Sequence, residues 1–278
     1  MTLLRPALWL AALVGPLLAS ACADDPARTE PTPEPELVSL GLSETATLSV
    51  ELLAEAPLAV GLNQVYYRLR SLPSGALVTR ATVTQVPIMH MAAMDKEHSC
   101  PCEQPPAVAN DDGLYPAFIV FQMASGMSGD AWRNEVTIEL PDGGDPIEVT
   151  FAELAVAASS ARKDLTLTDA MGGTSVAIVT LDFAAAPAVG HNPFTVTVHQ
   201  KADMMGMVWS PLSDLVITAT PDMPSMGHGS TGNEAPAHVA AGRYQGSVNL
   251  TMPGTWRIVL SFARGEQTLG AVEYTLDL

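Results

Sequence analysis

Apolar and polar residues alternate along much of the chain with a period of two, which is typical of half-buried β-strands. The alternation is clearest in RYQGSVNLTM (243–252) and TWRIVLSF (255–262). Runs rich in Val and Thr, such as TSVAIVTLDF (174–183) and DLVITAT (214–220), predict further strands. A short Pro-Gly segment joins residues 252 and 255, so we expect a tight turn and a hairpin between these two strands.

The sequence contains two related halves. AVGLNQVYYRL (59–69) aligns with AVGHNPFTVTV (188–198), and GLYPAFIVFQM (113–123) aligns with GRYQGSVNLTM (242–252). AWRNEVTIEL (131–140) then aligns with TWRIVLSFAR (255–264). We therefore expect two homologous domains, 37–157 and 162–278, joined by a linker at 158–161. FAELAVAASSARK (151–163) is expected to be a last strand and a linker, with a helix as the alternative.

About six or seven short strands in each half predict an all-β fold of two tandem antiparallel β-sandwiches. Each half exceeds 100 residues, which is long enough for a core of its own. The formal net charge of −17 argues against binding of nucleic acid or of anionic lipid surfaces, because both need basic patches. It fits attraction to cations, or solubility alone.

The N-terminus predicts export. Residues 1–21 hold one basic residue, an apolar run and small residues, as a secretory signal peptide does. The segment ends at Cys22, which we expect to carry a lipid anchor; ordinary cleavage with a free Cys22 is the alternative. Residues 22–36 are rich in Pro and acids and predict an extended tether. We expect a location in the cell envelope, on the periplasmic or outer-membrane side.

Both halves carry a segment rich in Met and His, namely PIMHMAAMDKEHSCPC (87–102) and PDMPSMGHGS (221–230). Thioether sulfur and imidazole are ligands that Cu(I) favours. The candidate ligands are Met91, Met94, His98 and Met123 in the first half, and Met223, Met226, His228 and Met252 in the second half. The alternative is that these side chains pack over the open end of the sandwich, since methionine is a common core filler.

Cys100 and Cys102 have no counterpart in the second half. In an oxidising compartment two cysteines usually pair, although a bond across one intervening residue is strained. The two residues are therefore either a disulfide or further metal ligands. No phosphate-binding Gly-rich loop, nucleophile elbow or His-Glu-x-x-His motif is present, so we expect no enzymatic activity.

The order Gly-x-Asn, Met-Pro-x-Met-x-His, Tyr and Gly-x-Trp resembles the YtkA-like domain family, which is related to FixH-type proteins. The second half follows this pattern closely, with MPSMGH at 223–228 and MPGTW at 252–256. The first half departs from it at MAAMDKEHS (91–99), which lacks the Pro and is longer before the His.

The resemblance implies an immunoglobulin-like sandwich in the cell envelope and a role in copper handling, including supply to respiratory oxidases. We therefore expect a non-catalytic lipoprotein that binds or transfers copper. Its partner would be an envelope or respiratory protein that receives the metal. The alternative is a structural or protein-interaction module that binds no metal.

Overall fold

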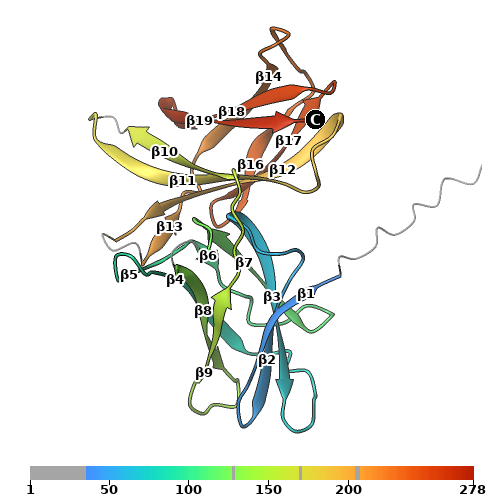
Figure 1. The fold of residues 1–278 in the computed structure, drawn as a ribbon, viewed down its shortest axis with the longest axis vertical. Coiled ribbons are helices and arrows are strands. Elements are labelled where there is room, and N and C mark those ends of the chain that lie inside the picture. The colour runs from blue at the N-terminus through green and yellow to red at the C-terminus, as the bar shows by residue number, and fades with distance from the viewer. Residues whose placement is uncertain (1–35, 127–128, 169–170, 204–206) are drawn as a thin grey trace, which may run out of the picture. The chain divides into compact units, whose positions relative to one another are not determined.

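The structure is a computed structural model, and it describes residues 36–126, 129–168, 171–203 and 207–278. The predicted signal peptide, Cys22 and nearly all of the tether lie outside these residues. Glu36–Leu278 forms one compact unit. All of the regular structure in the described residues is β-strand, and the strands pair antiparallel within every sheet (Figure 1), so the all-β prediction is confirmed. Membrane-spanning helices are correspondingly absent from this part of the chain.

The first nine strands form two sheets, with the orders β1-β2-β3-β7-β6 and β5-β4-β8-β9. These strands are called the N-terminal sandwich below. Their bounds are β1 Val38–Glu44, β2 Leu48–Ala54, β3 Gly61–Ser71, β4 Thr82–Met91, β5 Lys96–Ser99, β6 Cys102–Glu103, β7 Leu114–Phe121, β8 Ala131–Glu139 and β9 Ile147–Leu154.

The later strands form two further sheets, with the orders β10-β11-β12-β17-β16 and β15-β14-β18-β19, and β13 pairs with β12. These strands are called the C-terminal sandwich. Their bounds are β10 Arg162–Thr168, β11 Thr174–Phe183, β12 Gly190–Lys201, β13 Trp209–Pro211, β14 Val216–Met223, β15 His228–Gly229, β16 Glu234–Ala240, β17 Arg243–Leu250, β18 Thr255–Arg264 and β19 Gln267–Asp277.

The two sandwiches repeat one topology. When β13 is set aside, the strand orders of the second pair of sheets reproduce those of the first pair strand for strand. In each sandwich the inner faces of both sheets enclose one core, built around Trp132 in the first and Trp256 in the second. Both indoles are fully buried. Two antiparallel sheets that enclose a single core are the immunoglobulin-like arrangement.

The predicted hairpin between residues 243–252 and 255–262 is wrong. β17 pairs with β12 and β16, whereas β18 pairs with β14 and β19 in the other sheet. The Pro-Gly turn therefore carries the chain across the core from one sheet to the other. The alternation of apolar residues is the same in both cases, because each strand turns one face to the shared core and the pattern does not reveal the partner strand.

The Gly-x-Asn motif builds the same turn at the start of β3 and of β12. Gly61 and Gly190 have φ angles of 118° and 115°, a conformation that favours glycine. The side-chain amide of Asn63 donates to the backbone carbonyls two and four residues earlier, and its oxygen accepts from the N–H four residues earlier. Asn192 makes the same three bonds. The repeat in the sequence is thus a repeat of turn chemistry.

The segment 151–163 is a strand followed by a connection. β9 ends at Leu154, and β10 begins at Arg162. Between them Ala157 makes a bridge to Ala59 near the start of β3. The helix considered as an alternative does not form.

Candidate functional site

One rung of the β5–β4–β8 sheet carries His98, Met89 and Trp132. In the strand register Met89 lies opposite His98 on one side and opposite Trp132 on the other. Residues directly opposite each other point to the same face of a sheet, and Met89 and Trp132 are fully buried. His98 therefore faces the inside of the sandwich at its rim. Its ring lies edge-on to that of Trp132, with the centroids 5.6 Å apart.

Met123 reaches the same place from the opposite sheet. It follows the end of β7, and its backbone carbonyl accepts a 2.9 Å hydrogen bond from Nε1 of Trp132. Its side chain is half-buried, and its Sδ lies 3.3 Å from Nε2 of His98. The indole thus holds the backbone of Met123 beside the histidine on its own rung. Two of the side chains predicted from the sequence as ligands are brought into direct contact.

The other ring nitrogen of His98 determines what Nε2 can do. Nδ1 lies 3.0 Å from the carbonyl oxygen of Ser99, which can only accept a hydrogen bond. In the neutral imidazole Nδ1 therefore carries the proton, and Nε2 presents its lone pair to the sulfur of Met123. Thioether sulfur cannot donate a hydrogen bond either. Two acceptors thus face each other, an arrangement that a metal cation between them stabilises.

The donor pair suits a soft metal ion. Ligand atoms that share an ion lie roughly 3–4 Å apart, since each is about 2.0–2.3 Å from the metal. A carbonyl that binds the second ring nitrogen is also the usual support of a metal-binding histidine. Met91 lines the same cavity of about 370 Å³ as His98 and Met123, together with Lys96, Glu97, Gln122, Arg162 and Lys201. Met91, His98 and Met123 are called the first candidate site below.

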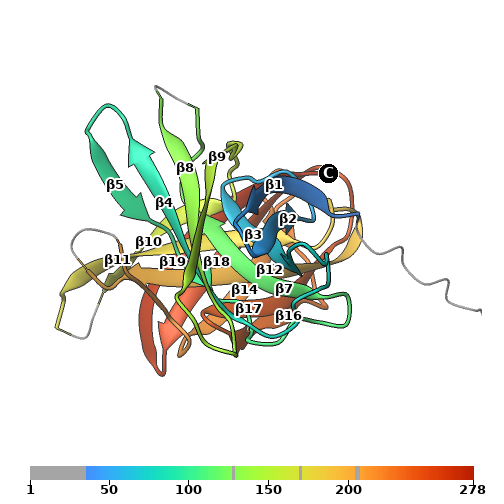
Figure 2. The same ribbon diagram turned by 90° about the horizontal axis from the view of Figure 1, so that it is seen from below.

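Met94 lies apart from this group. It is 58% exposed in the turn between β4 and β5, where its N–H donates to the carbonyl of Met91. The rung of the β4–β5 ladder next to this turn pairs Met91 with Lys96, and His98 lies two rungs away from it, about 7 Å along the strand. Figure 2 shows this hairpin extending from the sheet. The structure therefore places Met94 in solvent and does not bring it to the first candidate site.

The C-terminal sandwich repeats the arrangement with a shorter hairpin. His228 lies opposite Met223 in the β14–β15 ladder, and its ring lies edge-on to Trp256 at 6.1 Å. Nδ1 of His228 lies 3.0 Å from the carbonyl of Gly229, and Nε1 of Trp256 donates to the carbonyl of Met252 at 3.0 Å. His228, Met252 and Met223 are called the second candidate site.

The second candidate site differs from the first, because in the described part of the chain no hydrogen-bond contact joins Nε2 of His228 to the sulfur of Met252. Met223 is buried, and it packs against the turn at Gly254, where an added Cβ would lie 3.1 Å from its methyl carbon. His228 and Met252 are half-buried. Met226 is 62% exposed at the turn, and its N–H donates to the carbonyl of Met223 as that of Met94 does to Met91.

The ladders show which methionines correspond. By its place in the turn Met91 matches Met223, as the sequence alignment assumed. By its place opposite the histidine, however, it is Met89 that matches Met223. The first hairpin is longer by two rungs, so no single residue of the first half fills both roles. The sequence alignment did not pair Met89 with Met223, because Met89 lies nine residues before His98 whereas Met223 lies five residues before His228.

The two cysteines are free thiols in the structure. Cys100 is buried in the core, and Cys102 is half-buried with its Sγ 3.7 Å from the carbonyl oxygen of Gln85. Burial raises the pKa of Cys102 to about 11, and burial together with the neighbouring Cys102 raises the pKa of Cys100 well above its ordinary value. Neutral buried thiols are poor metal ligands, because the thiolate is the form that binds.

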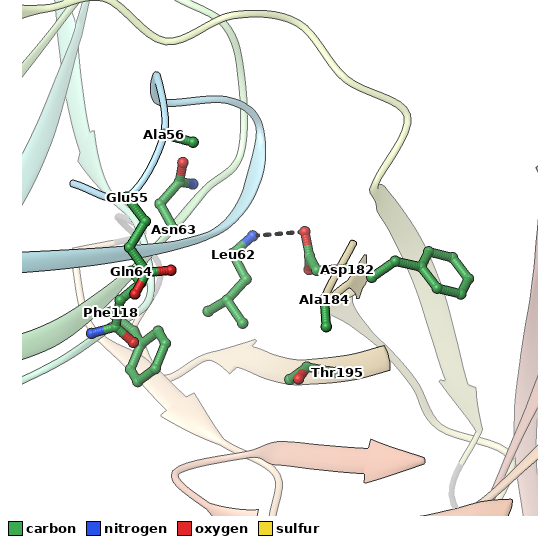
Figure 3. A pocket seen from close by; sticks show the side chains of 10 residues that line it. Glu55, Ala56, Leu62, Asn63, Gln64, Phe118, Asp182, Ala184 and Thr195 are labelled. Atoms are coloured by element: carbon green, nitrogen blue, oxygen red, sulfur yellow. Dashed lines mark hydrogen bonds between the residues drawn. The ribbon is translucent and has the colours of Figure 1, made fainter. Parts of the chain in front are cut away.

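Other parts of the described chain offer no rival metal cluster: no three or more His, Cys, Asp and Glu side chains are grouped there to hold an ion. A cavity of about 320 Å³ lies beside Leu62 and Asp182 (Figure 3). There the backbone N–H of Leu62 donates to Asp182 at 3.3 Å, and burial raises the pKa of Asp182 to about 6. Glu55 also lines this cavity, where its carboxylate accepts a hydrogen bond from the hydroxyl of Tyr66, and the lining includes no imidazole or sulfur ligand.

The chain has limited similarity to known proteins. Residues 168–261 match the family model described as YtkA-like, a segment that contains Met223, His228, Met252 and Trp256. No curated protein matches the chain. A structure of the S-layer protein SbsC, domains 5-6, is 11% identical, with 87% of this chain and 98% of that one covered, at a TM-score of 0.25.

The titin Ig tandem domains A164-A165 are also 11% identical, with 79% of this chain and 88% of that one covered, at a TM-score of 0.19. These scores are too low to carry an argument about fold or function. The family match agrees with the resemblance seen in the motifs of the second half. The similarity to the YtkA-like family thus covers residues 168–261 of the chain.

Proposed function

We propose that this protein binds Cu(I) at the rim of each sandwich and passes it to another protein of the cell envelope. The observation that carries the proposal is the contact between Nε2 of His98 and Sδ of Met123 at 3.3 Å, with Nδ1 of the same ring held by the Ser99 carbonyl. Imidazole and thioether are a donor set that favours Cu(I) over hard cations. Copper is cargo in this account, and no catalytic step is involved.

The second candidate site supports the proposal by repetition. His228 has the same ring-to-carbonyl contact and the same tryptophan neighbour as His98, and Met252 has the same place relative to Trp256 as Met123 has relative to Trp132. In the first site, packing alone would not require Nε2 of the half-buried His98 to lie 3.3 Å from the sulfur of Met123. We assign Met91, His98 and Met123 as ligands of the first ion, and His228 and Met252 as ligands of the second, with Met223 beneath them.

The exposed turn methionines suit the transfer step. Met94 and Met226 are each more than half exposed at equivalent turn positions, outside the recessed sites. A thioether there can hold Cu(I) weakly while the ion enters or leaves. We propose that the recipient is an envelope or respiratory protein with soft ligands of its own. Export by residues 1–21 and a lipid on Cys22 would place the protein at the membrane where such recipients work.

The test is competition for Cu(I) under anaerobic, reducing conditions between the mature protein and a chromogenic Cu(I) chelator. The unsubstituted protein is expected to withdraw two equivalents. His98→Ala and His228→Ala are each expected to remove one equivalent. His191→Ala is the matched control, because His191 is exposed and lies outside both sites. Circular dichroism of each variant verifies that the sandwich is intact.

The same titration separates the rival function. A structural or protein-interaction module would leave all the copper on the chelator, and the histidine variants would behave like the control. Mass spectrometry of the membrane fraction tests the anchor independently: a diacylglyceryl group on Cys22 supports it, and a soluble protein with an unmodified N-terminus rejects it.

A further inference from the structure

The carbonyl that orients His98 also receives a hydrogen bond from the C-terminal sandwich. Nε1 of Trp209, in β13, lies 3.2 Å from the carbonyl oxygen of Ser99. Nε2 of Gln122 donates to the same oxygen at 3.2 Å, and Nδ1 of His98 is 3.0 Å from it. One backbone oxygen thus joins a candidate ligand of the first site to a side chain more than 100 residues further along the chain.

This carbonyl lies at the edge of a sheet. It belongs to the last residue of β5, a four-residue strand at the edge of its sheet. Edge strands pair on one side only, so side-chain donors contribute much of what fixes such a peptide group. Trp209 is itself held in place, because β13 pairs with β12 and the amino group of Lys201 lies 5.7 Å from the centre of the indole ring.

The second candidate site provides an internal comparison. The carbonyl of Gly229 receives the ring nitrogen of His228, and within the described residues no side chain from elsewhere adds a bond to it. The two sites therefore have the same histidine contact, but only the first has an outside donor on the orienting oxygen. A change at Trp209 should act on the first site and leave the second as it is.

We propose that Trp209 is a positioning residue for the first site: by fixing the Ser99 carbonyl, it keeps the proton of His98 on Nδ1 and the lone pair of Nε2 toward Met123. The C-terminal sandwich thereby raises the affinity of the N-terminal sandwich for its ion. The position of the proton on His98 does not depend on a bound ion, whereas the effect on the affinity of the first site rests on the proposed Cu(I) function.

The experiment uses the full mature chain, with Trp209→Phe as the main variant. Phenylalanine keeps an aromatic ring beside Lys201 and removes the N–H donor. Long-range ¹H–¹⁵N spectra of the metal-free protein near pH 8 report which ring nitrogen of each histidine is protonated. In the unsubstituted protein His98 is expected to be protonated at Nδ1, and in Trp209→Phe a second tautomer should appear at His98 while His228 stays unchanged.

Copper binding supplies the second readout. The affinity of the first site for Cu(I) is expected to fall about fivefold in Trp209→Phe, the effect of losing one neutral hydrogen bond, with the second site unaffected. Gln122→Leu removes the other outside donor and should act in the same direction, which keeps the test decisive where Trp209→Phe disturbs folding. An unchanged tautomer of His98 overturns the proposal, as does an equal loss of Cu(I) affinity at both sites.

The two proposals fail in different ways. If the unsubstituted protein binds no Cu(I), the proposed function is rejected, and the ¹⁵N spectra alone decide whether Trp209 positions His98. If copper binds but Trp209→Phe leaves the His98 tautomer as it was, the function stands and the positioning role is rejected.

Discussion

Trp132 donates its indole N–H to the backbone carbonyl of Met123, from the opposite sheet, at 2.9 Å. The bond ties the two sheets together at the rim where His98 also lies. Trp256 makes the same bond to Met252 in the other sandwich. The tryptophan and the methionine that the two halves share are thus the donor and the acceptor of one hydrogen bond, which fixes the backbone of a candidate ligand in each sandwich.

Replacing either tryptophan should therefore destabilise its sandwich. Trp132→Phe removes the hydrogen bond to Met123 and leaves unfilled volume in the core. We expect a loss of about 2–3 kcal/mol in the free energy of unfolding, measured by urea denaturation. Trp256→Phe should cost a similar amount. A loss below about 0.5 kcal/mol in both variants, the size of an ordinary surface change, would contradict the role given to these indoles.

The sulfur of Met123 can be removed without changing its volume much. Met123→Leu should weaken Cu(I) binding at the first site by roughly tenfold or more, because a ligand atom is lost. The fold should remain, since Leu and Met exchange at small cost. Met89→Leu is the matched control: Met89 is buried on the same rung and contributes packing. If the two variants changed the Cu(I) affinity equally, Met123 would contribute packing, as Met89 does, and would not be a ligand.

Asp182 should make stability depend on pH. Burial raises its folded-state pKa from 3.8 to about 6, so its protonated form is favoured in the fold. The stability that this gives is present below about pH 4 and is lost as the pH rises through 6. Asp182→Asn should therefore stabilise the protein at pH 7, by on the order of 2 kcal/mol, and have little effect at pH 4. Urea unfolding at both pH values measures this difference. The prediction would be contradicted if the free energies of unfolding of the two proteins differed by the same amount at pH 4 and at pH 7.

The thiols should react slowly in the folded protein. With its pKa raised to about 11, Cys102 holds about a hundredfold less thiolate at pH 8 than an ordinary thiol with a pKa of 9. Labelling with a thiol reagent should therefore be slow in buffer and fast in urea, for both Cys100 and Cys102. Mass spectrometry counts the labels. Protein that stays unlabelled in urea until a reductant is added would show instead that the two residues form the disulfide considered from the sequence.

Much of the fold follows from local patterns. Alternation marked the strand at 255–262 because it turns one face to a core, and Val- and Thr-rich composition marked the strand at 174–183. The Gly-x-Asn repeat coincides with a turn that needs a positive φ and an amide cap. Strand pairing was harder to infer. The Pro-Gly segment before Trp256 indicated a tight turn but not that the chain crosses the core there, because a hairpin and a crossing use the same turn residues.

For the candidate site, too, residue types could be read from the sequence whereas contacts in space could not. Residue type identified His98 and Met123, which lie 25 positions apart and meet in the structure. The sequence could not show that Met94 lies in solvent, since its exposure depends on its place in the turn at the end of the β4–β5 hairpin. Nor could it show that Trp209 reaches the Ser99 carbonyl, because that bond depends on how the two sandwiches meet and not on any pattern within one of them.

The most direct test of the central claim is NMR of the mature protein with ¹³C-labelled methionine methyl groups, titrated with Cu(I) in the absence of oxygen. If copper binds at the sandwich rims, the methyl signals of Met123 and Met252 shift within the first two equivalents of Cu(I). Those of Met94 and Met226 should respond only to excess metal. If Met123 and Met252 stay unchanged while the exposed turn methionines alone respond, or if no methyl signal shifts at all, copper binding at the sandwich rims is contradicted.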